Sequence, residues 1–294
     1  MSAFIDTSTT DAAPATGAAG STVLAVFTLT ERELVRFFRQ RTRVISALGQ
    51  PIIFWVLFGA GLRDSFRAPG FADVDAAMSY QEYFFPGVAV MIVMFTAIFS
   101  TITVIEDRRE GFLQGVLVAP IPRWAIVLGK LCGGTVLAVL QAGLFLVIGP
   151  ALHIIGLAPA MQIDVAPVSV VLCAGFLILL SFQLTALGYM IAWRMDSTHG
   201  FHAIMSVFLL PMWLLSGAFF PASESGWLSW VIRLNPLTYG VAGLRRILYA
   251  NAIPASDAVL PQPALCVLVT VVVTAIYVAL CIVLTRTRFS HDAR

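Results

Sequence analysis

The chain has 294 residues, of which 59% are apolar and only 12% are charged, and its net charge is +2. Soluble domains carry about 25% charged residues, so this chain has too little polar surface to cover a water-soluble globule, and its mean hydropathy of +0.90 agrees. The near-zero net charge also excludes a nucleic-acid-binding face, which needs clustered Lys and Arg. The composition therefore predicts an integral membrane protein.

Short tails are predicted at the two ends of the chain. Residues 1–27 are expected to form a disordered cytoplasmic tail, because residues 1–21 are rich in Ala, Thr, Ser, Gly and Pro. A secretory signal would need a basic group and an apolar block, and residues 1–21 contain neither. Residues 289–294 are expected to form a second cytoplasmic tail.

Residues 28–43 predict an amphipathic helix. Leu34, Phe37 and Phe38 follow helical spacing, whereas the basic face carries Arg32, Arg36, Arg39, Arg41 and Arg43. Thr30 and Glu33 match a capping box, so we expect the helix to begin near Glu31. A basic amphipathic helix of this kind is expected to lie flat on the membrane surface.

Six apolar segments follow, each about as long as the roughly 20 residues that a helix needs to cross the hydrocarbon core. They are Val44–Leu62, Phe84–Ile105, Ala125–Ile148, Ala166–Trp193, Phe201–Phe220 and Ala264–Thr285. The pair Gly149-Pro150 predicts that the third helix ends or kinks there. The sequence therefore predicts a membrane domain of six spans over residues 44–288.

The basic residues set the expected orientation. With the N-terminus inside, thirteen lie in cytoplasmic segments: Arg32, Arg36, Arg39, Arg41, Arg43, Arg108, Arg109, Arg123, Lys130, Arg194, Arg286, Arg288 and Arg294. Five lie outside: Arg63, Arg67, Arg233, Arg245 and Arg246. This positive-inside bias predicts that both termini are cytoplasmic. The expected location is the inner (plasma) membrane.

Residues 221–263 are too apolar for a plain external loop. They contain two short apolar stripes, formed by Trp227, Leu228, Trp230, Val231 and Leu234 and by Val241, Leu244, Ile247 and Leu248. The pair Asn235-Pro236 separates the two stripes. We expect two short helices that dip into the outer leaflet as a re-entrant hairpin, because each stripe is too short to span the bilayer.

The cytoplasmic loop of residues 106–124 is the most informative stretch. Charges of both signs alternate over Glu106–Glu110, a break is expected at Gly111, and residues 112–118 predict a second amphipathic turn. Composition alone also allows a solvated loop that obeys the positive-inside rule. Against that alternative, the apolar face of residues 112–118 lies at the water boundary and needs a partner.

These residues resemble a family. The order of acid, Arg, Glu110-Gly111, Leu, Pro120-Ile121-x-Arg123 and Gly129-Lys130 is similar to the signature loop of ABC type-two exporter permeases. A second match comprises Ser216–Pro221, Trp227-Leu228, Asn235–Tyr239 and Leu244-Arg245. The resemblance extends from about Thr28 to Arg288 and is greatest to permeases of the daunorubicin-resistance and nodulation lipo-oligosaccharide exporter type.

The resemblance implies an all-α integral membrane protein with six transmembrane helices, an N-terminal interface helix and an external re-entrant hairpin. It implies a cytoplasmic ABC ATPase subunit as partner, coupled through Arg32, Glu33, Arg36, Phe37, Phe38, Glu106, Arg108, Arg109, Glu110, Gly111, Pro120 and Arg123. It also implies an exit segment that includes Trp227, Asn235, Pro236, Tyr239 and Arg245. The arginines of this segment are expected to reach the outer head groups or the polar end of the transported molecule.

The chain itself has no G-x-x-x-x-G-K-[ST] motif for ATP. Gly129-Lys130 is followed by Leu131, and Trp124 stands where the first glycine is needed. We therefore expect no cofactor on this chain and no enzymatic activity of its own, with ATP and Mg bound by the partner subunit. Six spans are few for a wide pathway, so a second copy of the permease is expected to complete it.

Two other functions stay open from the sequence: a self-contained secondary transporter and a non-transporting membrane scaffold. Secondary transporters usually carry ionisable residues near the bilayer midplane. The spans of this chain instead contain the uncharged Gln50, Gln141 and Gln183. The lack of an intramembrane charge favours an apolar or amphipathic substrate, such as a drug, lipid or glycolipid, over an ion.

Two smaller patterns are assigned to structure and not to function. His199 and His202 lie near Asp196, but without further ligands they are interpreted as interfacial histidines, and no metal site is predicted. Gly129 and Gly133 form a small-xxx-small pattern that predicts close helix packing.

Overall fold

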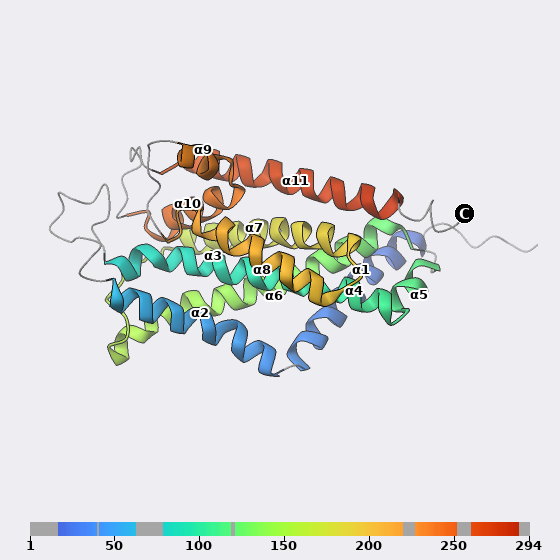
Figure 1. The fold of residues 1–294 in the computed structure, drawn as a ribbon, viewed down its shortest axis with the longest axis horizontal. Helices are drawn as coiled ribbons and strands as arrows, with labels where there is room; N and C mark the ends of the chain where they lie inside the picture. Colours follow the sequence, from blue (N-terminus) through green and yellow to red (C-terminus); the bar gives the residue numbers. More distant parts are fainter. Residues whose placement is uncertain are drawn as a thin grey trace, which may run out of the picture.

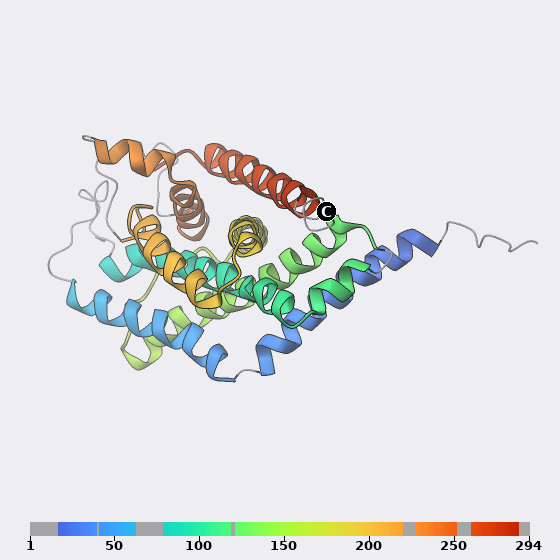
Figure 2. The same ribbon diagram turned by 45° about the vertical axis from the view of Figure 1, so that its right-hand side comes forward.

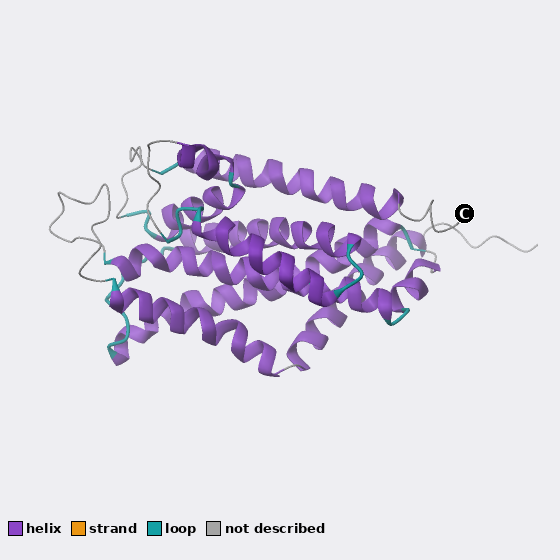
Figure 3. Cartoon of the chain, viewed as in Figure 1, coloured by secondary structure: helices purple, strands orange, loops and turns teal. Residues whose placement is uncertain are grey.

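The computed structural model describes residues 17–39, 41–62, 79–118, 121–219, 227–251 and 260–287. Every regular element in these residues is helical (Figure 3). Along the chain they are α1 (Gly17–Arg39), α2 (Arg41–Gly61), α3 (Tyr80–Ser100), α4 (Ile102–Arg109), α5 (Phe112–Val118), α6 (Arg123–Ala151), η1 (Leu152–Ile155), α7 (Pro167–Arg194), α8 (Thr198–Leu214), α9 (Trp227–Leu234), α10 (Pro236–Leu248) and α11 (Pro263–Thr287).

Helix α3 lies at the centre of an elongated bundle (Figure 1). It packs against α2, α6 and α7 and also contacts α8 and α10. In the most apolar stretch of Tyr80–Arg109, 83% of the residues are buried within the protein, whereas in that of Pro263–Thr285 only 17% are buried. Because the peripheral α11 is as apolar as α3 but exposed, its surface requires an apolar surrounding such as lipid.

Four described helical segments are long and apolar enough to cross a membrane: Tyr80–Arg109, Arg123–Ile155, Pro167–Arg194 and Pro263–Thr285. They coincide with the second, third, fourth and sixth predicted spans. The first and fifth predicted spans correspond to shorter apolar helices, Leu48–Gly61 and Thr198–Leu214. The 17 residues of α8 are about 26 Å long, slightly less than the roughly 30 Å hydrocarbon core. The protein is therefore a multi-pass helical membrane protein.

The predicted end of the third span is confirmed. Helix α6 ends at Ala151, one residue after Pro150, and continues as the short 3-10 helix η1. Gly156 then adopts a positive φ of 73° and ends the turn.

The N-terminal helix differs from the prediction at both ends, because α1 ends at Arg39, so that Arg41 and Arg43 lie in α2. Helix α1 begins at Gly17, so the expected start near Glu31 is wrong, and residues 1–16 of the predicted tail lie outside the described part. Thr30 caps nothing, because its hydroxyl lies inside the helix and donates to the carbonyl of Val26 at 2.8 Å. In Figure 2 this helix runs beyond the bundle beside α5.

The two predicted short helices after residue 221 are confirmed as α9 and α10. They lie at one end of the bundle, and α4 and α5 lie at the opposite end (Figure 1). The break falls at Asn235, whose side-chain oxygen accepts the N–H of Leu237 at 3.0 Å and caps α10, with Pro236 at its first position.

Candidate functional site

Helices α4 and α5 meet in a tight turn at the end of the bundle where charges collect. Gly111 adopts φ 76°, a left-handed conformation that a side chain would strain, and this turn separates α4 from α5. The predicted break at Gly111 is therefore confirmed. The turn places the charged face of α4 and the apolar face of α5 beside α1.

Asp107 forms the centre of a buried ionic cluster between α1, α4 and α6. Its carboxylate is fully buried and accepts two hydrogen bonds from Arg32, at 2.9 and 2.6 Å, and one from Arg36 at 3.1 Å. These hydrogen bonds to Asp107 raise the pKa of Arg32 above its usual value, so Arg32 is held in the charged form.

Lys130 of α6 completes this cluster from the other side. Its ammonium is also buried and pairs with both Glu33 of α1 and Asp107 of α4, and it lies 3.4 Å from the hydroxyl of Thr103. One cation thus links carboxylates from two different helices. Asp107 and Lys130 are not among the predicted coupling residues, although both stand in the motif that carries the resemblance.

Charged side chains at the rim of the cluster are more exposed. Arg36 pairs with Glu106 at 2.8 Å and lies 3.5 Å from Glu110, whose side chain is 59% exposed. Glu106, one of the predicted coupling residues, therefore has a salt-bridge partner within the chain. Arg109 and Glu110 are the exposed charged residues of the run.

Two arginines tie α4 to the connection between α7 and α8. Arg108 donates to the carbonyls of Trp193 at 2.7 Å and Met195 at 3.2 Å, and it pairs with the Asp196 carboxylate at 3.1 Å. Arg109 donates to the backbone carbonyl of Asp196 at 2.9 Å. Helix α4 is therefore fixed to α7 on one side and to α1 and α6 on the other.

Glycines on α6 bring α1 unusually close. A Cβ atom at Gly129 would lie 2.7 Å from the Cβ of Leu29, and one at Gly133 would lie 2.7 Å from the Cβ of Glu33. Gly129 and Gly133 are one turn apart on α6, and Leu29 and Glu33 are one turn apart on α1. Two successive turns of α1 therefore pack directly against glycines. The predicted small-residue packing is confirmed.

An apolar groove runs between α1 and α5 beside the cluster. It has a volume of about 550 Å³ and is lined by Leu24, Ala25, Thr28, Leu29, Phe112, Gly115, Val116 and Ile121. Phe27 of α1 is 65% exposed, and Phe112 is 36% exposed with the guanidinium of Arg32 lying 3.7 Å from its ring centre. This surface needs an apolar partner, as the sequence of α5 predicts.

The remaining predicted coupling residues are spread over this end. Phe37 is buried and Phe38 is 53% exposed, so the two aromatic neighbours face different surroundings. Arg123 is exposed at the start of α6. Pro120 lies outside the described residues.

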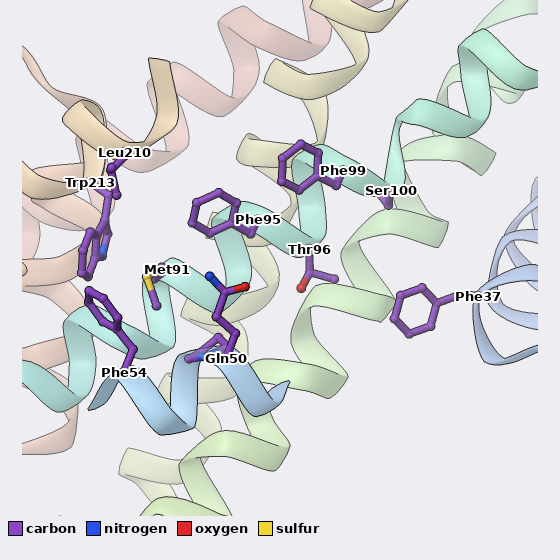
Figure 4. A pocket seen from close by; sticks show the side chains of 11 residues that line it. Phe37, Gln50, Phe54, Met91, Phe95, Thr96, Phe99, Ser100, Leu210 and Trp213 are labelled. Atoms are coloured by element: carbon purple, nitrogen blue, oxygen red, sulfur yellow. The ribbon is translucent and has the colours of Figure 1, made fainter. Parts of the chain in front are cut away.

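A cavity of about 350 Å³ lies between α1, α2, α3 and α8 (Figure 4). Its lining residues are Phe37, Gln50, Pro51, Phe54, Met91, Phe95, Thr96, Phe99, Ser100, Leu210 and Trp213. Five of these are aromatic and none is charged. Ligand pockets for small molecules are usually apolar and aromatic with a few polar groups, and this cavity has that composition.

Thr96, which lines the cavity, belongs to a buried polar pair. The hydroxyl of Thr96 donates to the side-chain oxygen of Gln141, which is buried on α6. The amide nitrogen of Gln141 is buried and has no hydrogen-bond partner among the described residues. Gln141 is not among the lining residues, so this amide lies behind the cavity wall, and the polar side chains of the wall itself are Gln50, Thr96 and Ser100.

An aromatic cluster closes the cavity toward the end that carries α9 and α10. The ring of Phe219, which follows α8, lies 5.2 Å from the rings of both Phe58 and Phe84. It lies 6.1 Å from the ring of Trp213, which lines the cavity. Because Phe219 is 8% exposed, it fills the space between α2, α3 and α8.

Arg245 and Arg246 of α10 do not reach outward, and the predicted snorkelling is wrong for both. Arg245 is 3% exposed and donates to the carbonyls of Tyr83 at 3.1 Å and Gly217 at 3.2 Å. Arg246 is 8% exposed and donates to carbonyls just before α11, at 2.8 and 2.9 Å. Only Arg233 is exposed as expected. The buried guanidinium groups satisfy backbone carbonyls that helix packing has removed from water.

The other predicted residues of this segment have structural contacts. The side-chain nitrogen of Asn235 donates to the carbonyl of Met212 at 2.6 Å and ties α10 to α8. The hydroxyl of Tyr239 donates to the carbonyl of Arg233 at 2.9 Å and ties α10 to α9. Trp227 begins α9, and its side chain lies outside the described part. No group of three or more His, Cys, Asp or Glu within the described residues could hold a metal ion.

Comparison with known proteins decides the family. The model of the ABC-2 type transporter family matches residues 25–249, which include the ionic cluster, the cavity, α9, α10 and every residue of the groove except Leu24. The chain belongs to the ABC-2 type transporter family. Membership of this family implies association with an ABC ATPase partner and confirms the resemblance of the two motifs.

Individual relatives agree with this assignment. The chain is 28% identical over 229 residues to a putative transport permease, ycf38, of Cyanophora paradoxa, and the match covers 77% of this chain and 74% of the relative. It is 26% identical over 164 residues to the probable multidrug ABC transporter permease YbhR of Escherichia coli strain K12, with 55% and 42% covered. It is 22% identical over 242 residues to the daunorubicin resistance ABC transporter permease DrrB1 of Streptomyces coeruleorubidus, with 80% and 78% covered.

Proposed function

We propose that this ABC-2 permease is the membrane subunit of an ATP-driven exporter that moves an apolar or amphipathic molecule outward. The cavity between α1, α2, α3 and α8 is the observation that carries the proposal. Its aromatic and aliphatic walls would bind the apolar body of such a molecule, and Gln50, Thr96 and Ser100 would bind a polar group. Names of two relatives, which refer to multidrug transport and daunorubicin resistance, support this substrate class.

The proposed topology has six spans with both termini in the cytoplasm, in the inner (plasma) membrane. Helices α2 and α8 supply the two shorter spans, and α9 with α10 forms the re-entrant hairpin on the outside. The hairpin position is supported by the separation of α9 and α10 from the charged end of the bundle (Figure 1). Two copies of the chain would form the complete pathway, because six spans per copy are few for a bulky molecule.

The ATPase subunit would bind at the end that carries α4 and α5. The groove between α1 and α5 offers the apolar contact, and Arg109 and Glu110 offer exposed charges around it. Interfaces usually combine an apolar centre with a polar rim, and this surface has both. ATP and Mg would bind to that subunit and not to this chain.

Reconstituted proteoliposomes test the proposal. The permease is incorporated together with its ABC ATPase subunit, and movement of a fluorescent amphipathic dye is followed with and without ATP. We expect ATP-dependent transport that falls by about tenfold in Trp213→Ala, because this change removes an aromatic wall of the cavity. Val207→Ala on the exposed face of α8 is the control and should transport normally.

Two outcomes would overturn the proposal. Transport driven by an ion gradient in liposomes without the ATPase would identify a secondary transporter. Equal transport by Trp213→Ala and Val207→Ala would show that the cavity does not bind the transported molecule.

A further inference from the structure

Aromatic rings from four helices surround the cavity (Figure 4). Helix α1 supplies Phe37, α2 supplies Phe54, α3 supplies Phe95 and Phe99, and α8 supplies Trp213. The ring centres of Phe95 and Phe99 lie 5.7 Å apart with an angle of 21° between the ring planes, and those of Phe54 and Trp213 lie 6.3 Å apart. A molecule bound in the cavity would therefore contact several rings at once.

Three side-chain hydrogen-bond donors of the cavity wall are already used within the protein. The hydroxyl of Thr96 donates to Gln141, and the hydroxyl of Ser100 donates at 2.7 Å to a carbonyl of its own helix, three residues earlier. The indole N–H of Trp213 donates to the carbonyl of Gly87 at 2.8 Å. Because a hydroxyl has one O–H and two lone pairs, Thr96 and Ser100 can only accept a further hydrogen bond, from a molecule in the cavity.

The groups that remain on the cavity wall have negative electrostatic character. Aromatic rings carry negative potential on their faces, and hydroxyl oxygens carry it at their lone pairs. Among the lining residues that the structure describes, none is charged, and apart from the three donors above only Gln50 has a side-chain N–H or O–H group. An anion would therefore be poorly solvated in this cavity, whereas both the rings and the oxygens would attract a cation.

We propose that the cavity is selective for a lipophilic cation, such as a protonated amine or a quaternary ammonium or phosphonium ion that carries apolar groups. The proposal rests on the proposed function, because it narrows the class of molecule that the exporter would move. The positive centre would lie against the rings of Phe95, Phe99 and Trp213, within the roughly 6 Å at which a cation is attracted to a ring centre. An N–H group of a protonated amine would donate to the oxygens of Thr96 and Ser100.

Two probes of the same shape and opposite charge test the selectivity: the tetraphenylphosphonium cation and the tetraphenylborate anion. Binding of each radiolabelled probe to the full-length permease in lipid nanodiscs is measured, and binding to empty nanodiscs is subtracted. The parent protein should bind the cation about tenfold more tightly than the anion. For every variant, the Kd is divided by the Kd of the parent, so that partitioning of the probe into lipid cancels.

Phe95→Leu removes a ring and keeps an apolar side chain. It should weaken binding of tetraphenylphosphonium by about tenfold and change binding of tetraphenylborate by less than about twofold, because only the cation is attracted to the ring face. Phe208→Leu is the control, since it removes a ring of α8 that is 57% exposed and does not line the cavity. This control should change neither Kd.

Gln50 provides a second test that does not depend on core packing, because its side chain lines the cavity and is exposed. Gln50→Lys adds a positive charge to the wall and should weaken binding of tetraphenylphosphonium by about tenfold. Gln50→Glu adds a negative charge and should strengthen binding of the same probe. The two variants should have opposite effects on binding of tetraphenylborate.

The outcomes separate this inference from the proposed function. Equal affinity of the parent for the two probes, or an equal loss of both in Phe95→Leu, would overturn the cation selectivity and leave the exporter proposal intact. Unchanged binding of the cation in both Phe95→Leu and Gln50→Lys would also overturn the inference, because the cation would then bind elsewhere. Binding of the cation that depends on Phe95, together with an absence of ATP-dependent dye transport, would overturn the proposed function and leave the cation site.

Discussion

Replacing Gly133 with Ala should loosen the contact between α1 and α6. The new Cβ would lie 2.7 Å from the Cβ and 2.9 Å from the Cγ of Glu33, whereas carbon atoms normally approach to about 3.5–4.0 Å. Because the Cβ of Glu33 is fixed to its backbone, α1 must retreat by about 1 Å. Such overpacking costs about 1–3 kcal/mol in the free energy of unfolding.

Gly143→Ala on the same helix is a matched control with the opposite expected sign. A Cβ at Gly143 meets no atom within 4 Å, so the substitution adds no clash. Ala in a helix interior is favoured over Gly by roughly 0.5–1 kcal/mol, which should stabilise the protein slightly.

Thermal unfolding in detergent measures both variants. The Tm of Gly133→Ala should fall by about 2–12 °C, since about 1 kcal/mol shifts Tm by roughly 2–4 °C in a chain of this size. The Tm of Gly143→Ala should stay equal or rise. Equal Tm values for the two variants would refute the close packing of α1 on α6.

Two further predictions concern the opposite ends of the bundle. Arg245→Met should lower the free energy of unfolding, measured by denaturant titration, by about 1.5–3 kcal/mol, because two buried carbonyls lose a charged donor. The control Arg233→Met changes an exposed residue and should alter this free energy by less than about 0.5 kcal/mol. Similar losses in both variants would contradict the burial of Arg245. Phe112→Ala should weaken copurification of the ATPase subunit by about tenfold, because Phe112 lines the groove. Gln114→Ala, which changes an exposed neighbour of Phe112, should leave the yield of the ATPase subunit unchanged. An unchanged yield for Phe112→Ala would exclude the groove as the docking surface.

The sequence alone was sufficient for the features that depend on local chemistry. Its apolar segments predicted a helical membrane protein, since a backbone in lipid must satisfy its hydrogen bonds within helices. Gly111 and the pair Asn235-Pro236 predicted breaks because their backbone preferences hold in any surroundings. The two motifs were also enough to indicate the family, which the comparison confirmed.

The tertiary structure alone decided which charged residues are buried. Asp107 is one of five consecutive charged residues in the sequence. It becomes the centre of the cluster only because folding brings Lys130, 23 residues away, and Arg32, 75 residues away, into contact with it. Arg245 was expected to reach outward, but the carbonyls of Tyr83 and Gly217 bind it inside the bundle.

The start of α1 was missed for the same reason. The Ala- and Gly-rich residues before Thr28 have little helical pattern of their own, yet α1 extends back to Gly17 and packs on α6 where Leu29 meets Gly129. Most helical stability in proteins comes from such packing and not from local propensity. Local sequence therefore determined where the backbone of this permease can bend, and only long-range packing determined which of its charges meet and how far its first helix extends.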